Sequence, residues 1–67
     1  MKNEWVKVFI TRDFYRAELV RQFLIDNDIE AVLLNKQGFP YNIGEVEVHV
    51  HSSAMEKATD LIKGQDL

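Results

Sequence analysis

The chain has 67 residues, fewer than most single domains, and a domain this short buries only about 60% of the surface that its unfolded chain exposes. It contains no cysteine, so disulfides cannot compensate, and we expect oligomerisation to add stability. The net charge of -3 has the wrong sign for attracting nucleic acid, and no apolar run approaches the roughly 20 residues of a membrane span. Because the N-terminus also lacks a signal-peptide pattern, we expect one soluble, cytoplasmic domain over residues 1–67, with its core in 5–62 and no nucleic acid or membrane partner.

Residues 5–11 (WVKVFIT) alternate in the period-two pattern of a strand with two different faces. The pattern predicts that Val6, Val8 and Ile10 point into the core. It places Trp5 and Phe9 together on the opposite face, either as an exposed contact patch or, for Trp5, folded over an edge of the core.

A helix is predicted next, with Asp13 as its N-cap and Asp26 as its last residue. Asn27 and Asp28 tolerate the left-handed conformation that ends many helices, so the helix should stop there. Its predicted apolar stripe consists of Phe14, Ala17, Val20, Phe23 and Leu24.

The second half of the chain predicts a hairpin followed by another helix. Residues 29–35 (IEAVLLN) read as a strand whose two faces the sequence does not rank, and 36–44 (KQGFPYNIG) as the hairpin loop. Residues 45–51 alternate strictly, with the valines on one face and the Glu and His residues on the other. Ser53 to Glu56 match a capping box, which starts a helix with the apolar stripe Ala54, Ala58, Leu61 and Ile62 and an end at Gly64.

These elements predict an α+β domain, a ferredoxin-like βαββα arrangement without its last strand. A right-handed crossover makes the first two strands parallel and leaves the third between them, so the sheet is antiparallel with the order second, third, first. Both helices should cover the face lined by the valines. The first strand is then an open edge guarded only by Lys7, which favours a homodimer through this edge or through the Trp5 and Phe9 face, or else a plain edge protected by twist.

Three segments carry a resemblance to a known family: residues 17–20 (AELV), 27–31 (NDIEA) and 44–48 (GEVEV). Over residues 5–62 the chain resembles a family of prokaryotic signal-transducing proteins, which are small bacterial domains of unknown function similar to PII-type regulators. Where that family often has glycine before the second strand, this chain has Asp28. The resemblance implies a PII-like fold and a role in signal transduction, with 36–44 corresponding to the working loop of PII-type regulators. No glycine-rich phosphate cradle accompanies it, so we expect no nucleotide and no other cofactor.

Two histidines and two glutamates on one strand face offer the strongest alternative. His49 and His51 are spaced to share a metal ion, with Glu47 or Glu45 adding an oxygen ligand, although a solvated sheet face shows the same alternation. Both glutamates should be exposed, where nothing raises a pKa for acid catalysis, and no serine or threonine lies in a nucleophile-elbow pattern. We therefore expect a protein that is not an enzyme.

The leading hypothesis is a regulatory or adaptor domain that binds a protein partner or a small effector. The expected contact residues are Phe39 and Tyr41 in the hairpin loop and Trp5 and Phe9 on the open sheet. The loop side chains either cap the end of the core, as expected for Ile43, or stay exposed for a partner. A metal-binding module using His49 and His51, and a self-associating structural domain, remain as alternatives.

Overall fold

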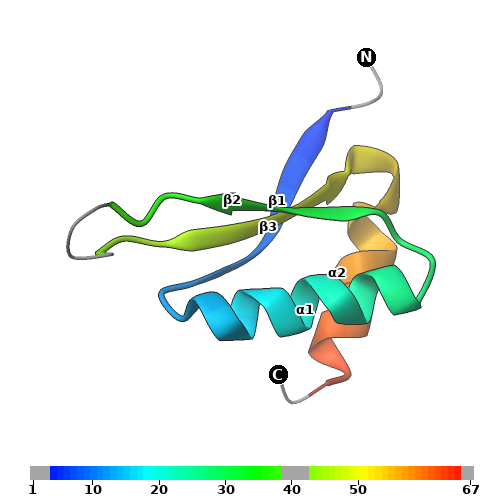
Figure 1. Cartoon of the computed structure of the whole chain (residues 1–67). Coiled ribbons are helices and arrows are strands. Elements are labelled where there is room, and N and C mark those ends of the chain that lie inside the picture. The colour runs from blue at the N-terminus through cyan, green and yellow to red at the C-terminus, as the bar shows by residue number, and fades with distance from the viewer. Residues whose placement is uncertain (1–3, 39–42, 66–67) are drawn as a thin grey trace.

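The computed structural model describes residues 4–38 and 43–65, which form a sheet layer and a helix layer (Figure 1). Five of its elements are β1 (Trp5–Thr11), α1 (Phe14–Asp26), β2 (Ala31–Asn35), β3 (Val46–His51) and α2 (Met55–Lys63). The sheet is antiparallel with the order β1-β3-β2, which confirms the order predicted from the crossover rule. Among the described residues, no helix has the length and apolarity needed to cross a bilayer.

The core lies between the central strand and the two helices. Val46, Val48 and Val50 of β3 are completely buried, and Val20 and Leu24 of α1 are buried against the same layer. Each such side chain contributes roughly 1.5 to 3 kcal/mol when it is removed from water. The predicted valine face of β3 is therefore the face that the helices cover.

A β-bulge in β1 changes which of its residues point into this core. Lys7 pairs with His49, but the next pair is Phe9 with Val48, so Val8 is the extra residue. Val8 and Phe9 consequently both pack against the core, whereas Ile10 turns to the opposite face. The predicted positions of Phe9 and Ile10 were wrong, because the prediction assumed unbroken alternation through the strand.

The first helix begins and ends as predicted. Asp13 accepts hydrogen bonds from the backbone N–H groups of Tyr15 and Arg16, and the chain leaves the helix through Asp28 at a φ of 66°. The Ile29 N–H donates to the Leu24 carbonyl, which is the backbone bond of a Schellman cap.

Two details of the helices differ from the prediction. Phe14 is exposed on the flank of α1, whereas Ala17, Val20 and Leu24 are buried and Phe23 packs against the core. The capping box at Ser53 is absent, because residues Ser52–Ala54 form a 3-10 turn and α2 starts only at Met55, with Ala54 as its N-cap. The stripe predicted for this helix is correct, since its residues pack against the core, namely Ala54, Ala58, Leu61 and Ile62.

The second strand is shorter than predicted, because Ile29 and Glu30 lie outside it. Its register with β3 settles which face is buried: Ala31 pairs with Val50 and Leu33 with Val48 on the core side. Val32 and Leu34 therefore point to the face without helices.

Candidate functional site

One face of the sheet is covered by no described element, and we call it the open face. It is formed by every second residue of β2 and β3 and by the residues of β1 that lie opposite them. Its members are Trp5, Lys7, Ile10, Val32, Leu34, Glu47, His49 and His51. The four large apolar side chains among them are each between 40% and 45% exposed.

Glu47 lies at the centre of the open face and is only 7% exposed. His49 Nε2 donates a hydrogen bond to its Oε1 at 2.9 Å, while Lys36 Nζ lies 3.2 Å and Lys7 Nζ 3.7 Å from its Oε2. The hydrogen bond from His49 and the nearby lysines lower the pKa of the Glu47 carboxyl from its ordinary value of 4.5. The sequence had predicted an exposed Glu47. The flanking strands bury it instead, and the two lysines leave this centre with one excess positive charge.

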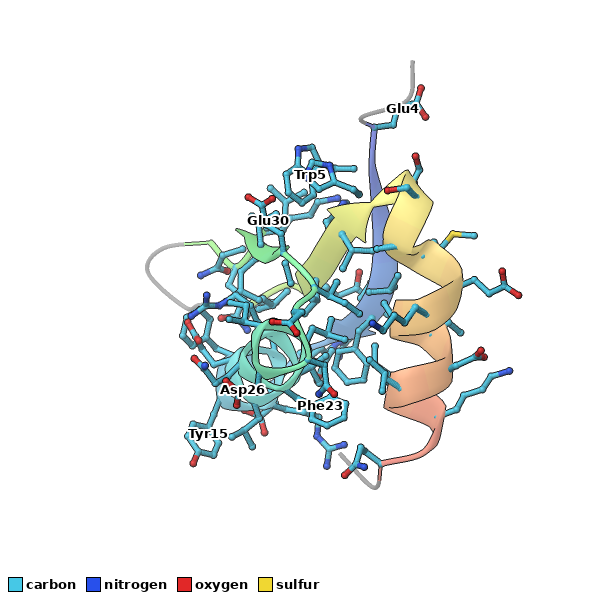
Figure 2. All side chains as sticks on the ribbon, turned by 90° about the vertical axis from the view of Figure 1, so that its right-hand side faces the viewer. Glu4, Trp5, Tyr15, Phe23, Asp26 and Glu30 are labelled. Atoms are coloured by element: carbon cyan, nitrogen blue, oxygen red, sulfur yellow. The ribbon has the colours of Figure 1, made fainter. Side chains whose placement is uncertain are left out.

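At one end of the open face, Trp5 stacks on His51. The two ring centroids are 3.9 Å apart, with an angle of 29° between the ring planes. His51 Nε2 also lies 3.2 Å from Glu30 Oε1, so the imidazole joins strand β1 to the residue before β2. Figure 2 shows Trp5 and Glu30 at this same end of the sheet. Of the two alternatives for Trp5, the structure shows the exposed one, since Trp5 lies on this face and is 40% exposed.

Beyond the sheet, the chain between β2 and β3 continues as a two-stranded arm, described at residues 36–38 and 43–45 (Figure 1). The Lys36 N–H donates to the Glu45 carbonyl and the Gly38 N–H to the Ile43 carbonyl. Gln37 Nε2 donates to the Arg12 carbonyl at 2.8 Å, which ties the arm to the turn after β1. The base of the arm is thus fixed relative to the open face.

Gly44 is a required residue at the base of this arm. Its φ is 134°, and a Cβ there would lie 2.7 Å from the backbone oxygen of Lys36. Ile43 is 75% exposed, so the expectation that it caps the core was wrong. The predicted contact residues Phe39 and Tyr41 lie outside the described residues.

The structure therefore brings together a different set of residues from the predicted one. Of the predicted residues, Trp5 lies on the open face, whereas Phe9 packs against the core. The open face also contains three apolar residues that the sequence analysis missed: Ile10, Val32 and Leu34. The signal available for Ile10 was the run of three apolar residues Val8, Phe9 and Ile10, which breaks the alternation of the strand. For Val32 and Leu34 the signal was the strict alternation of β3, which fixes the faces of its neighbour once they pair.

The two histidines of the metal hypothesis are held by different carboxylates, His49 by Glu47 and His51 by Glu30. Within residues 4–38 and 43–65, no three His, Cys, Asp or Glu side chains are grouped as a metal site requires. The described geometry therefore gives the metal hypothesis no additional support.

Comparisons with known proteins gave no match to a protein-family model, to a curated protein or to a solved structure. The resemblance to prokaryotic signal-transducing proteins therefore stays a prediction that these comparisons neither support nor oppose.

Proposed function

We propose that this chain is a small regulatory or adaptor domain that binds a protein partner through its open face and hairpin arm. In fold terms we propose a ferredoxin-like, PII-like domain that lacks the last strand. The strand order β1-β3-β2 and the position of both helices on one face support this classification.

The observation that carries the proposal is the composition of the open face. Four partly exposed apolar side chains lie on this face. Ile10 and Leu34 flank the Glu47 carboxylate, which neighbouring cations already neutralise, whereas Val32 lies beside His49 and Trp5 at the end of the face. Single apolar residues scattered over a surface are normal, but several gathered on one uncovered face favour an interaction site. Because Glu47 is buried and paired with cations, covering it costs a partner less desolvation than covering a bare carboxylate would.

The charges on the open face indicate the chemistry of the partner. Lys7 and Lys36 share the single Glu47 carboxylate, and about half of each lysine side chain remains exposed. We therefore expect the partner to place an acidic group near these ammonium groups, flanked by apolar side chains. The lowered pKa keeps Glu47 ionised at neutral pH, which suits a structural counter-ion better than a general acid.

The hairpin arm provides a second contact next to this face. Its base is fixed by Gln37 and Gly44. The exposed Ile43 can therefore contact a partner without the loss of backbone freedom that a mobile base would add to binding. The proposed binding surface thus combines the open face with the base of the hairpin arm. Phe39 and Tyr41 remain proposed contacts in the loop.

Affinity capture from an extract of the native cell tests this proposal. Immobilised wild-type chain is compared with Ile10→Lys on the open face and with Leu19→Lys, a matched control on α1 where Leu19 is 44% exposed and Ile10 is 41% exposed. The expected result is a protein retained by the wild type and by Leu19→Lys but lost with Ile10→Lys. Equal retention by all three chains contradicts a role for the open face.

A further inference from the structure

The outer edge of β2 has backbone N–H and C=O groups without a partner strand, and the hydrogen bonds to β3 show which residues carry them. The Lys36 N–H donates to the Glu45 carbonyl, so the backbone groups of residues 36, 34 and 32 point toward β3. Those of Ala31, Leu33 and Asn35 consequently point away from the sheet. The edge therefore offers three N–H and three C=O groups to another strand.

The two edges of the sheet differ in how well they are protected against such pairing. Strand β1 carries the bulge at Val8 and an exposed Lys7, both of which discourage strand addition. Strand β2 pairs with β3 without interruption from Ala31 to Asn35 and carries no charged side chain within those residues. The edge open to pairing is thus β2, rather than β1 as the sequence had suggested.

We propose that a second copy of this chain pairs antiparallel along β2, with Leu33 opposite Leu33 of the second copy. The pairing joins two sheets into one continuous sheet around a two-fold axis, with β2 beside β2 at its centre. This geometry places Ala31 opposite Asn35 of the second copy, so all the outward backbone groups of both copies become hydrogen-bonded.

Side chains on the open face are self-complementary in this register. Along this face the side chains are acidic at Glu30, apolar at Val32 and Leu34, and basic at Lys36. In the antiparallel pair, Glu30 therefore lies opposite Lys36 of the second copy, and Val32 opposite Leu34 of the second copy. The side chains of Glu30 and Lys36 are 70% and 55% exposed, although each already contacts a group of its own chain. Both can therefore reach across the new strand pair.

The flank of α1 next to this edge is self-complementary as well. Helix α1 packs against all three strands but most closely against β2, whereas α2 packs against β1 and β3. Phe23 points from α1 toward α2 (Figure 2), so the opposite flank of α1 lies on the side of the β2 edge. That flank is formed by residues four, three and four positions apart: Phe14, Glu18, Arg21 and Ile25.

An antiparallel pair of such helices matches apolar with apolar and acid with base. Phe14 meets Ile25 of the second copy, and Glu18 meets Arg21 of the second copy. Glu18 and Arg21 form an ion pair of 2.8 Å within one chain, and in the dimer the two pairs can combine into a network of four charges. Phe14 and Ile25, both exposed in the single chain, would be covered.

The strand pairing and the helix pairing call for the same two-fold axis. The midpoint of the α1 flank lies about 10 Å along the helix from its end at Asp26, given a rise of about 1.5 Å per residue. Leu33 lies about 13 Å along the extended chain from Ile29, given about 3.3 Å per residue. The midpoint of the helix flank and the midpoint of β2 therefore lie at similar distances from the turn that joins α1 to β2, so one two-fold axis can pass near both. Dimerisation extends beyond the proposed function. It leaves the open faces uncovered, although Lys36, which lies 3.2 Å from Glu47 on the open face, would take part in both interactions.

Exchanging charges at the edge tests the dimer by sedimentation. Glu30→Lys or Lys36→Glu alone sets like charges opposite each other twice per dimer, so the dissociation constant should rise about tenfold. Mixing the two variants restores opposite charges at every edge pair and should recover a dimer containing one chain of each. If the mixture associates no better than the single variants, the edge assignment is overturned.

A second measurement uses the wild-type chain, so its result does not depend on how any variant folds. In a mixture of isotopically labelled and unlabelled chains, the pairing predicts an intermolecular NOE between the Hα atoms of Val32 and Leu34. Within one chain these atoms lie two residues apart along a strand and are too distant for that signal. A chain that stays monomeric at millimolar concentration, or a dimer lacking this NOE, overturns the proposal.

Discussion

Phe9 of β1 lies directly opposite Val48 of β3 on the core side of the sheet, although simple alternation along β1 would have turned it outward. The bulge at Val8 produces this relationship, since one extra residue exchanges the faces of every residue that follows it in the strand. The exchange covers an aromatic ring with the helices and releases Ile10 to the open face. The bulge thus helps both to fill the small core and to compose the candidate binding surface.

Substitutions at these neighbouring positions should have very different effects on stability. Phe9→Ala leaves a void in the core and should lower the free energy of unfolding by about 2 kcal/mol, less than for a fully buried phenylalanine. Ile10→Ala should change it by no more than about 0.5 kcal/mol, as is usual at exposed sites. Urea unfolding measures both, and a larger loss for Ile10→Ala than for Phe9→Ala would contradict the bulged register.

The two glycines of the hairpin arm provide a matched pair of variants. Gly44→Ala forces a Cβ against the Lys36 carbonyl at a positive φ and should cost about 1 to 3 kcal/mol. Gly38→Ala is the control, since a Cβ there has no neighbour within 4 Å. Thermal unfolding should show a clear drop for Gly44→Ala alone, and equal melting temperatures would show that the arm does not need glycine.

Asp28 holds a left-handed backbone conformation that glycine adopts with less strain. Asp28→Gly relieves the backbone strain, but glycine also gives the unfolded chain more conformational freedom, which offsets part of that gain. The free energy of unfolding should therefore rise by about 0.5 to 1 kcal/mol. Asp28→Ala, which keeps a Cβ but loses the local polar side chain, should be destabilising. Denaturant midpoints test the pair, and a gain for Asp28→Ala would contradict the strained cap.

The central carboxylate predicts a specific dependence of stability on pH. Because folding lowers the pKa of Glu47 below its ordinary value of 4.5, the folded state is favoured above that pH, and the advantage is lost as the pH falls through the lowered pKa. Wild-type chain should exceed Glu47→Gln in stability at neutral pH, and the difference should shrink in acid. A difference that stays constant from neutral pH into strong acid would show that the charge of Glu47 is not responsible.

The sequence alone predicted much of this fold, because the signals involved are local. Asp13, Asp28 and Gly64 mark helix ends through their own backbone and side-chain chemistry, and the valines of β3 mark its buried face. The crossover rule then fixed the strand order. The Ser53 capping box failed because a 3-10 turn occupies those residues, and whether a turn precedes a helix depends on how the chain leaves the sheet.

The candidate site was harder to predict because it depends on contacts between strands. The bulge at Val8 leaves no trace in the sequence beyond the apolar run Val8, Phe9 and Ile10, so the prediction placed Phe9 and Ile10 on the wrong faces. Glu47 looks like any alternating polar residue, yet its place on the central strand surrounds it with side chains of both neighbours. The burial of Glu47 cannot be read from spacing within one segment, and the apolar run in the first strand does not by itself say which residue is the extra one.

The most direct test of the proposed open-face function is photo-crosslinking in the native cell. Two variants are compared. One carries a photoreactive amino acid in place of Ile10 on the open face, and the other carries it in place of Leu19 on α1, a site of similar exposure. Ile10 also lies on β1, away from the β2 edge, so a crosslink there is not expected from the dimer. The account predicts a discrete crosslinked partner protein from position 10 that is absent from position 19. No product at position 10, or the same products from both positions, would contradict it.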